Sequence, residues 1–218
     1  MRTRIVSAST AAGRAPDSVR LVAVSKTFST DAVREAAAIG QRDFGENYVQ
    51  EAVEKLRNTV DLPLVWHFIG PIQSNKTVLL AEHFDWVHTI DREKIARRLS
   101  EQRPEGRAPL NVCIQVNISG ESSKSGVAST DVTALARIIT SLPRLRLRGL
   151  MAIPENTDDP DLQRQAFARL RTILESLQRD GMVLDTLSMG MSADLEAAIA
   201  EGATMVRVGT AIFGERNR

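Results

Sequence analysis

A lysine ends the first apolar run of the chain. Residues 21–28 read LVAVSKTF, and in an extended strand the alternation of side chains places Val22, Val24 and Lys26 on one face. An ammonium group that enters an apolar interior loses hydration, which favours the neutral amine, and a neutral amine condenses with an aldehyde to form a Schiff base. Lys26 is therefore a candidate Schiff-base lysine. The alternative is an ordinary solvated lysine that follows a strand.

Two loops late in the sequence combine glycine with hydroxyl side chains. The first reads SMGMSAD, in which Gly190 permits a tight turn and Ser192 precedes a predicted helix. The second contains Gly209 and Thr210 after a short apolar run. Backbone N–H groups at a helix start bind phosphate, so the two loops together predict a phosphate site. Small polar residues beside glycine are also typical of ordinary turns, which is the alternative for each loop.

Arg207 lies between these two loops in the sequence. By strand alternation it shares a face with Met205 and Gly209, so its guanidinium group can point into the interior beside the predicted phosphate site. A surface or salt-bridged arginine on a short strand is the other interpretation.

These residues require a fold that brings several strand ends together. Apolar runs alternate with segments of helical periodicity along the whole chain, and no two consecutive runs are joined by a hairpin. After the Lys26 run, strands are expected at residues 44–45, 64–69, 85–90, 110–118, 145–152, 186–189 and 205–208. Eight strands separated by helices predict a parallel sheet, and the number eight favours a closed TIM barrel over an open doubly wound sheet.

The predicted architecture is one α/β domain over residues 1–218, a compact (β/α)8 barrel whose active site would lie at the C-terminal ends of the strands. Lys26, Asn47, His67 and Asn117 all lie at or just after such ends. Loops after the last two strands of such barrels commonly bind phosphate. The polar residues can therefore converge at one mouth of the barrel.

Composition and charge exclude several kinds of partner. The 218 residues are 43% hydrophobic and 25% charged, with a formal net charge of +1, which indicates a globular domain and gives no field for nucleic acid or an anionic membrane. No run approaches the roughly eighteen apolar residues of a membrane span. The single cysteine, Cys113, lies in an apolar run, so we expect it in the core, in a reducing cytoplasm. Residues 1–15 are Arg- and Ser-rich, faintly like a transit peptide, but a frayed or partial helix is the favoured interpretation.

Longer motifs identify a family. A lysine for an aldehyde, a phosphate site and an arginine between them match the functional groups of pyridoxal 5'-phosphate (PLP). The chain also contains AVSKTF, FGENYVQE, WHFIGPIQSNK, VNISGESSKSG, LRGLMAIP and LSMGMSADLEAAIAEGATMVRVGTAIFGER. From about Ser18 to Arg216 it resembles the pyridoxal phosphate homeostasis protein family, which is related to the N-terminal barrel of alanine racemase. Members of that family usually carry a longer leading helix.

The resemblance implies a fold-type III barrel without the C-terminal β domain of alanine racemase, with PLP bound as an internal aldimine on Lys26. It implies that Arg207 faces the pyridine nitrogen, and a permanent cation there opposes protonation of that nitrogen. It also implies further residues of the cofactor site: phosphate-binding Ser192, Gly209 and Thr210, and ring-lining Asn47 and His67.

We favour a carrier over an enzyme on chemical grounds. A racemase needs a second base opposite the lysine, and alanine racemase takes a tyrosine from its C-terminal domain. The only tyrosine here, Tyr48, begins a helix and is expected to pack. The predicted function is therefore intracellular PLP homeostasis by a monomer that delivers the cofactor to apo-enzymes. The alternative is a PLP-dependent amino-acid racemase or a related fold-type III enzyme of low activity, and a phosphate-binding barrel without a Schiff base is a third interpretation.

Lys124, in the loop SKSG, matches a second lysine that the family uses in cofactor handling. A second amine on a loop could accept the aldehyde by transimination, which would suggest a route for release. A solvated loop lysine is the alternative.

Overall fold

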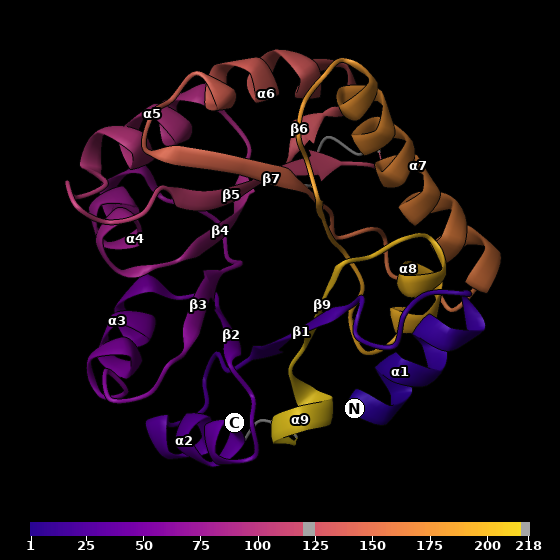
Figure 1. The fold of residues 1–218 in the computed structure, drawn as a ribbon, viewed down its shortest axis with the longest axis horizontal. Helices are drawn as coiled ribbons and strands as arrows, with labels where there is room; N and C mark the ends of the chain where they lie inside the picture. Colours follow the sequence, from indigo (N-terminus) through magenta and orange to yellow (C-terminus); the bar gives the residue numbers. More distant parts are fainter. Residues whose placement is uncertain (120–124, 215–218) are drawn as a thin grey trace.

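The structure, a computed structural model, describes residues 1–119 and 125–214. Strands and helices alternate along the chain (Figure 1). The strands are β1 (Arg20–Val24), β2 (Asp43–Glu46), β3 (Val65–Phe68), β4 (Trp86–Ile90), β5 (Leu110–Asn117), β6 (Val127–Ala128), β7 (Leu145–Met151), β8 (Thr186–Ser188) and β9 (Met205–Val208). The helices are α1 (Arg2–Ala11), α2 (Thr30–Ala38), α3 (Val49–Arg57), α4 (Thr77–His83), α5 (Glu93–Gln102), α6 (Val132–Thr140), α7 (Pro160–Arg179), α8 (Leu195–Ala200) and α9 (Thr210–Phe213).

The strands close into a barrel. Their order is β4-β3-β2-β1-β9-β8-β7-β5, and a further pairing of β4 with β5 joins the two ends. Every one of these pairings is parallel, and the helices form a ring outside the strands (Figure 1). The predicted TIM barrel is confirmed. The two-residue strand β6, which the sequence did not indicate, pairs with the end of β5 outside this ring of strands.

Two hydrophobic layers stabilise the barrel. The larger one lies between the strands and the surrounding helices and includes most of the buried aliphatic residues. The smaller one fills part of the barrel interior and consists of Val22, Trp86, Cys113, Met151 and Met205. Cys113 is buried as expected, and burial raises the pKa of its thiol to about 12. The inward positions of Val22 and Met205 confirm the strand alternation on which the placement of Lys26 and Arg207 depended.

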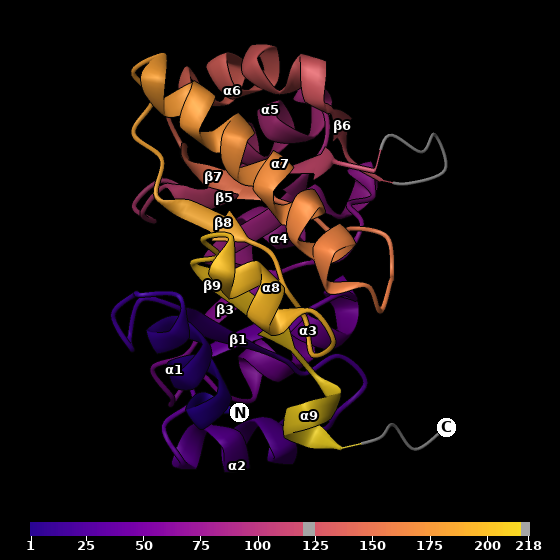
Figure 2. The same ribbon diagram turned by 90° about the vertical axis from the view of Figure 1, so that its right-hand side faces the viewer.

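The N-terminal helix contacts the loop after β8. Arg4 forms an ion pair with Glu196 of α8 at 2.5 Å, and its Nη1 donates to the carbonyl oxygen of Ser192 at 2.8 Å. Helix α1 therefore lies beside α8 against the barrel (Figure 2). Residues 1–15, expected to be a frayed or partial helix, thus include a helix that reaches one of the two glycine-containing loops.

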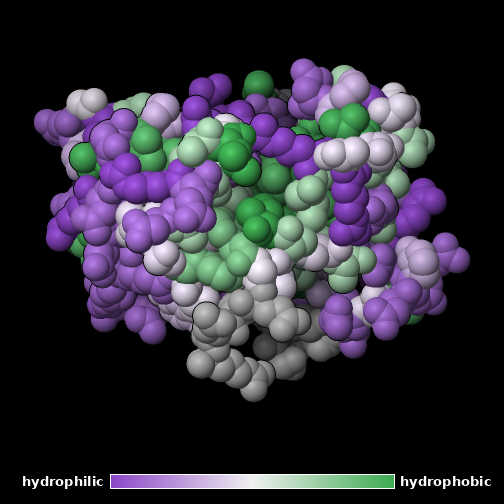
Figure 3. Space-filling view, turned by 90° about the horizontal axis from the view of Figure 1, so that it is seen from below, coloured by the Kyte–Doolittle hydropathy of each residue, from purple (hydrophilic) through white to green (hydrophobic). Residues whose placement is uncertain are grey.

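A cavity of about 410 Å³ lies near the N-terminal ends of β1 and β2, lined by residues of α1 and of the segments that precede these strands. Seen from the side of α2 and α9, hydrophobic residues gather in a hollow with hydrophilic residues around it (Figure 3). None of the residues that line the cavity of about 410 Å³ is a lysine, so this cavity has no amine that could form a Schiff base with an aldehyde.

Candidate cofactor site

A second cavity, of about 300 Å³, lies at the C-terminal mouth of the barrel. This volume lies at the lower end of the range for small-molecule sites. Six of the residues predicted from the sequence line it, and five others complete it. The lining residues are Val24, Lys26, Asn47, Ile69, Ile153, Met191, Ser192, Ala193, Arg207, Gly209 and Thr210.

Lys26 lies two residues beyond the end of its strand. The ladder of β1 extends by one bond, from the N–H of Ser25 to the carbonyl of Gly45 at 3.0 Å, and the chain then turns. Thr27 adopts φ 68°, a left-handed conformation that is uncommon outside glycine. The half-buried Lys26 therefore projects into the mouth from a turn rather than from the strand itself. Lys26 was predicted to end the strand, whereas the strand ends at Val24 and Lys26 belongs to the turn that follows.

A buried ionic cluster supports that turn. The ammonium group of Lys55 donates to the carbonyl of Ser25 at 2.7 Å, to Glu46 at 2.8 Å and to Glu51 at 2.6 Å. The hydroxyl of Ser25 donates to Glu46 at 2.6 Å, and the N–H of Thr27 donates to Glu51 at 2.7 Å. Glu46 is fully buried, and burial raises its pKa against the opposing effect of Lys55. These contacts restrain both residues that flank Lys26.

Lys55 was not among the residues predicted from the sequence. Lys55 follows Glu51 by four residues, a spacing that pairs opposite charges on a helix. A lysine beside the apolar positions Ala52 and Val53 of α3 was the signal that could have identified a buried partner for Glu46.

The loop after β8 positions Ser192 at the cavity. Its turn requires glycine at position 190, where φ is 94°. A Cβ at this position would also clash, because it would lie 2.5 Å from the Cβ of Ala198. The N–H of Met191 donates to the carboxylate of Asp194, so the loop closes on the residue before α8. The carbonyl of Gly190 also accepts a bond of 2.9 Å from the N–H of Arg207, which connects the loop to β9.

The loop after β9 places Gly209 and Thr210 beside the lysine turn. A Cβ on Gly209 would lie 3.2 Å from the carbonyl oxygen of Val24, so the small residue lets the two segments approach closely. Phe213 of α9 stacks on Phe28 with ring centroids 5.0 Å apart. The start of α9 and the turn that carries Lys26 are therefore packed together.

Arg207 points into the barrel as the alternation of β9 predicted. It is 4% exposed; its Nη1 donates to the hydroxyl of Ser188 at 2.8 Å and its Nη2 to the carbonyl of Ala152 at 3.0 Å. Burial lowers the pKa of its guanidinium to about 10, so the group stays charged at neutral pH. These two contacts fix the plane of the guanidinium, and the same side chain lines the cavity.

Asn47 contributes a polar atom that lacks a protein partner. Its Oδ1 is buried and accepts no hydrogen bond within residues 1–119 and 125–214. Gly70 lies against the backbone of Asn47, since a Cβ there would be 2.3 Å from the carbonyl oxygen of Asn47. A buried unsatisfied amide is costly, so this atom indicates a place for a bound molecule or water.

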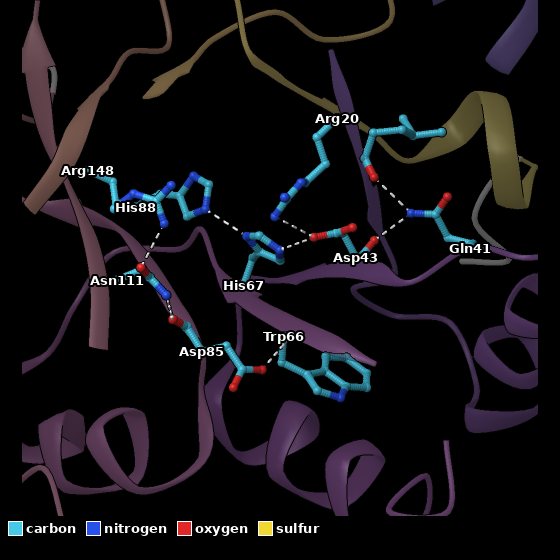
Figure 4. Close-up of polar contacts among 10 residues, drawn as sticks. Arg20, Gln41, Asp43, Trp66, His67, Asp85, His88, Asn111 and Arg148 are labelled. Carbon is cyan, nitrogen blue, oxygen red and sulfur yellow. Dashed lines mark hydrogen bonds and ion pairs between the residues drawn. The ribbon is translucent and has the colours of Figure 1, made fainter. Parts of the chain in front are cut away.

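The structure does not bring His67 to the cavity. The ring is fully buried on β3, with Nε2 2.9 Å from Oδ1 of Asp43 and Nδ1 2.9 Å from Nε2 of His88 (Figure 4). Asp43 begins β2, so the ring points toward the N-terminal ends of the strands and away from the mouth. His67 was predicted at the mouth, but it is not among the residues that line the cavity.

Two further predictions concerned Tyr48 and Lys124. Tyr48, expected to pack, is 57% exposed at the start of α3 and is not among the lining residues. Lys124, the predicted second lysine, lies outside the described residues.

Across the parts of the chain that the structure describes, no helix has the length and apolarity to cross a membrane, and no group of three or more His, Cys, Asp or Glu residues is arranged to hold a metal ion.

The two buried histidines make folding sensitive to pH. Burial lowers the pKa of His67 and lowers that of His88 further, so both rings are neutral when folded, whereas the unfolded chain protonates them near the ordinary value of 6.5. We expect the free energy of unfolding to fall as pH drops below 6.5, by up to about 1.4 kcal/mol per pH unit for each ring. Urea unfolding at pH 7.5, 6.5 and 5.5 measures this slope.

The variant His88→Asn is the comparison for that slope. It is expected to lose one ring's share of the pH dependence, whereas His83→Asn, at a half-buried position, should lose much less. The raised pKa of Glu46 acts in the opposite direction, but it is common to all three proteins and cancels in the comparison. Equal slopes in the wild type and His88→Asn would contradict the assignment.

The fold and the site together define a barrel of the alanine racemase N-terminal type. The family model described as "Alanine racemase, N-terminal domain" matches residues 7–217. A "Pyridoxal phosphate homeostasis protein" of Pseudomonas aeruginosa is 65% identical over 214 residues, which cover 98% of this chain and 92% of that protein. One of the same name from Escherichia coli is 53% identical over 220 residues, covering 100% of this chain and 94% of that protein. The chain belongs to the pyridoxal phosphate homeostasis protein family.

One relative has a solved structure that contains a bound ligand. PipY of Synechococcus elongatus, whose structure was determined with PLP bound, is 40% identical and superposes with a TM-score of 0.84. The match covers 96% of this chain and 100% of that one.

Proposed function

We propose that this protein binds PLP as a Schiff base on Lys26 and acts in PLP homeostasis, as a monomeric cytoplasmic carrier that releases the cofactor to apo-enzymes. The observation that carries the proposal is the single cavity shared by Lys26, Arg207 and the two loops that contain Ser192 and Thr210. The PLP-bound structure of PipY and the name shared by the curated relatives support it.

The residues present fit the cofactor. PLP supplies an aldehyde, a phosphate group and a pyridine ring. A C=N bond would form between Nζ of Lys26 and the aldehyde carbon, and the carbonyl oxygen would leave as water. The hydroxyl groups of Ser192 and Thr210, with N–H groups of the loops that carry them, suit the phosphate. The unsatisfied Oδ1 of Asn47 provides a polar contact at the cavity wall.

The charge of Arg207 favours storage over turnover. We place its guanidinium at the pyridine nitrogen, where a cation opposes protonation of the ring and so weakens the ring as an electron sink. Among the described residues that line the cavity there is no histidine, tyrosine or carboxylate, the side chains that commonly serve as the second base of a racemase. Both features support a carrier rather than a racemase.

The test is an absorption spectrum of the protein incubated with PLP, followed by borohydride reduction and peptide mass mapping. We expect a band near the visible edge and one reduced adduct, at Lys26. Addition of common amino acids in heavy water should leave the band and the α-protons unchanged. Proton exchange would support the racemase alternative, and adducts scattered over surface lysines would overturn the proposed site.

Delivery to apo-enzymes has its own measurement. The loaded protein is mixed with an apo form of a PLP-dependent enzyme, and recovery of that enzyme's activity is compared with recovery in the same concentration of free PLP. A carrier should restore activity, and a protein that retains its cofactor through the assay would contradict the delivery proposal.

A further inference from the structure

A continuous chain of hydrogen bonds runs through the barrel interior from the cavity toward its opposite end. Nη1 of Arg207 donates to Oγ of Ser188 at 2.8 Å, and the same oxygen lies 2.7 Å from Nδ1 of His88. Nε2 of His88 is 2.9 Å from Nδ1 of His67, whose Nε2 is 2.9 Å from Oδ1 of Asp43. Figure 4 shows the part of this chain from His88 through His67 to Asp43.

The chemistry of its two ends gives this chain one direction. A guanidinium group only donates, so Oγ of Ser188 accepts from Arg207, and its own hydrogen is then available for Nδ1 of His88. A neutral imidazole has one donor and one acceptor, so His88 then donates from Nε2 to His67, and His67 donates from Nε2 to the carboxylate of Asp43. All four bonds are satisfied only if both rings carry their proton on Nε2.

The reverse direction fails at Asp43. If His88 donated from Nδ1 to Ser188, then His67 would donate from Nδ1 to His88. A bare Nε2 of His67 would then face an ionised carboxylate, and two acceptors would meet without a proton between them. An ionised Asp43 therefore selects the direction of bonds that lie far from it, including the bond at Ser188.

The surroundings shield most of this chain of hydrogen bonds from water. Ser188, His88 and His67 are fully buried, and the side chain of Asp43 is 15% exposed. Four charged side chains lie near this region: Arg20, Asp85, Arg148 and Asp185. Nη1 of Arg20 is 3.4 Å from Asp43, and Asp85 accepts from the N–H of Trp66. The guanidinium of Arg148 pairs with Asp185 and lies 4.8 Å from the centroid of Trp86, whose ring stacks on His67. In such a dry interior an unpaired polar group is costly, so the directed arrangement is strongly favoured.

We propose that Asp43, His67 and His88 are positioning residues for Arg207: Asp43 selects the tautomers of the two rings, and the rings keep a lone pair of Ser188 directed at the guanidinium. With Nη1 bound to Ser188 and Nη2 bound to Ala152, the plane of Arg207 is set before any ligand enters. The relevance of this orientation to PLP rests on the proposed function. The bond directions themselves do not.

The first experiment uses the protein without PLP. The chain has only three histidines, so long-range ¹H–¹⁵N spectra of the imidazoles, with His83→Asn for assignment, report each tautomer. At pH 7.5 we expect His67 and His88 both protonated on Nε2 alone. In Asp43→Asn the amide can either accept from His67 or donate to it, so both rings should populate a second tautomer, although His88 does not touch residue 43.

Asp85→Asn is the matched control. It alters a carboxylate of the same region that bonds to the N–H of Trp66 at 2.9 Å and not to either ring, so both tautomers should stay unchanged. A merely structural role for Asp43 would leave the protonation site of His88 as it is in the wild type. An Nδ1-protonated ring in the wild type, or unaltered tautomers in Asp43→Asn, would overturn the proposal.

The second experiment compares the rate at which PLP is lost on dialysis. Asp43→Asn is expected to release PLP about tenfold faster than the wild type, the equivalent of about 1.4 kcal/mol, and Asp85→Asn at the wild-type rate. Altered tautomers with unaltered release would refute a positioning role. If the wild type itself bound no PLP, the proposed function would fail, while the spectra of the free protein would still decide whether Asp43 sets the tautomers.

Discussion

Replacing Lys26 by alanine is expected to abolish the covalent retention of PLP and to weaken its binding by about a hundredfold, which corresponds to about 2.7 kcal/mol. The amine is the only group among the described lining residues that can form an imine, and the loops that hold Ser192 and Thr210 would be left to bind the phosphate alone. The measurement is the absorption band and the borohydride-fixed adduct of the variant, with affinity from equilibrium dialysis.

Two companion variants sharpen that result. Lys26→Arg keeps a positive charge at the mouth but cannot form the imine, so it should lose the band as completely as the alanine variant. Lys94→Ala removes an exposed lysine from α5 and should behave as the wild type. A band that survives in Lys26→Arg, or an adduct that moves with full occupancy to another lysine, would show that the imine is formed elsewhere.

Replacing Lys55 by methionine is expected to lower the free energy of unfolding by about 3–5 kcal/mol, the range for breaking a buried ion pair from one side. The side chain of Lys55 is 5% exposed, and its ammonium group makes three hydrogen bonds, to Ser25, Glu46 and Glu51. Without it, the fully buried carboxylate of Glu46 loses its counter-ion. Urea unfolding at pH 7.5 measures the loss.

The double variant Lys55→Met with Glu46→Gln tests the cause. A glutamine removes the uncompensated charge and still accepts from Ser25, so the double variant should be more stable than Lys55→Met alone. Lys94→Met on the surface should lie within about 0.5 kcal/mol of the wild type. Since the cluster also holds the residues on both sides of Lys26, the Lys55 variant should form the imine more slowly, and unchanged stability would mean that the cluster does not support the turn.

These two polar networks of the barrel hold different parts of the cavity. The cluster of Lys55, Glu46 and Glu51 holds the backbone of the turn that carries the reactive amine. The chain from Asp43 through the two histidines holds a side chain on the other wall of the cavity. Both are built mostly from buried groups, so the cavity is preorganised before the cofactor binds, which lowers the entropy cost of binding.

Strand positions and side-chain faces were predictable from the sequence because both depend on local periodicity. Every predicted apolar run overlaps a strand of the barrel, and the period of two correctly turned Val22, Met205 and Arg207 inward. Parallel strands in a closed barrel bring their C-terminal ends to one mouth, so Lys26, Asn47, Ser192, Arg207, Gly209 and Thr210 line one cavity. Their roles toward PLP stay predictions that the experiments above test.

The sequence by itself determined which residues face the barrel interior, and only the tertiary structure decided how deep each one lies and what it touches. His67 was expected at the mouth, yet the stagger of neighbouring strands pairs it with Asp43 at the opposite end. Likewise, no local pattern connects His88 with Ser188, which are 100 residues apart and meet across the closed barrel. Depth and partnership depend on strand tilt and register, and these arise when the barrel closes rather than from any single segment.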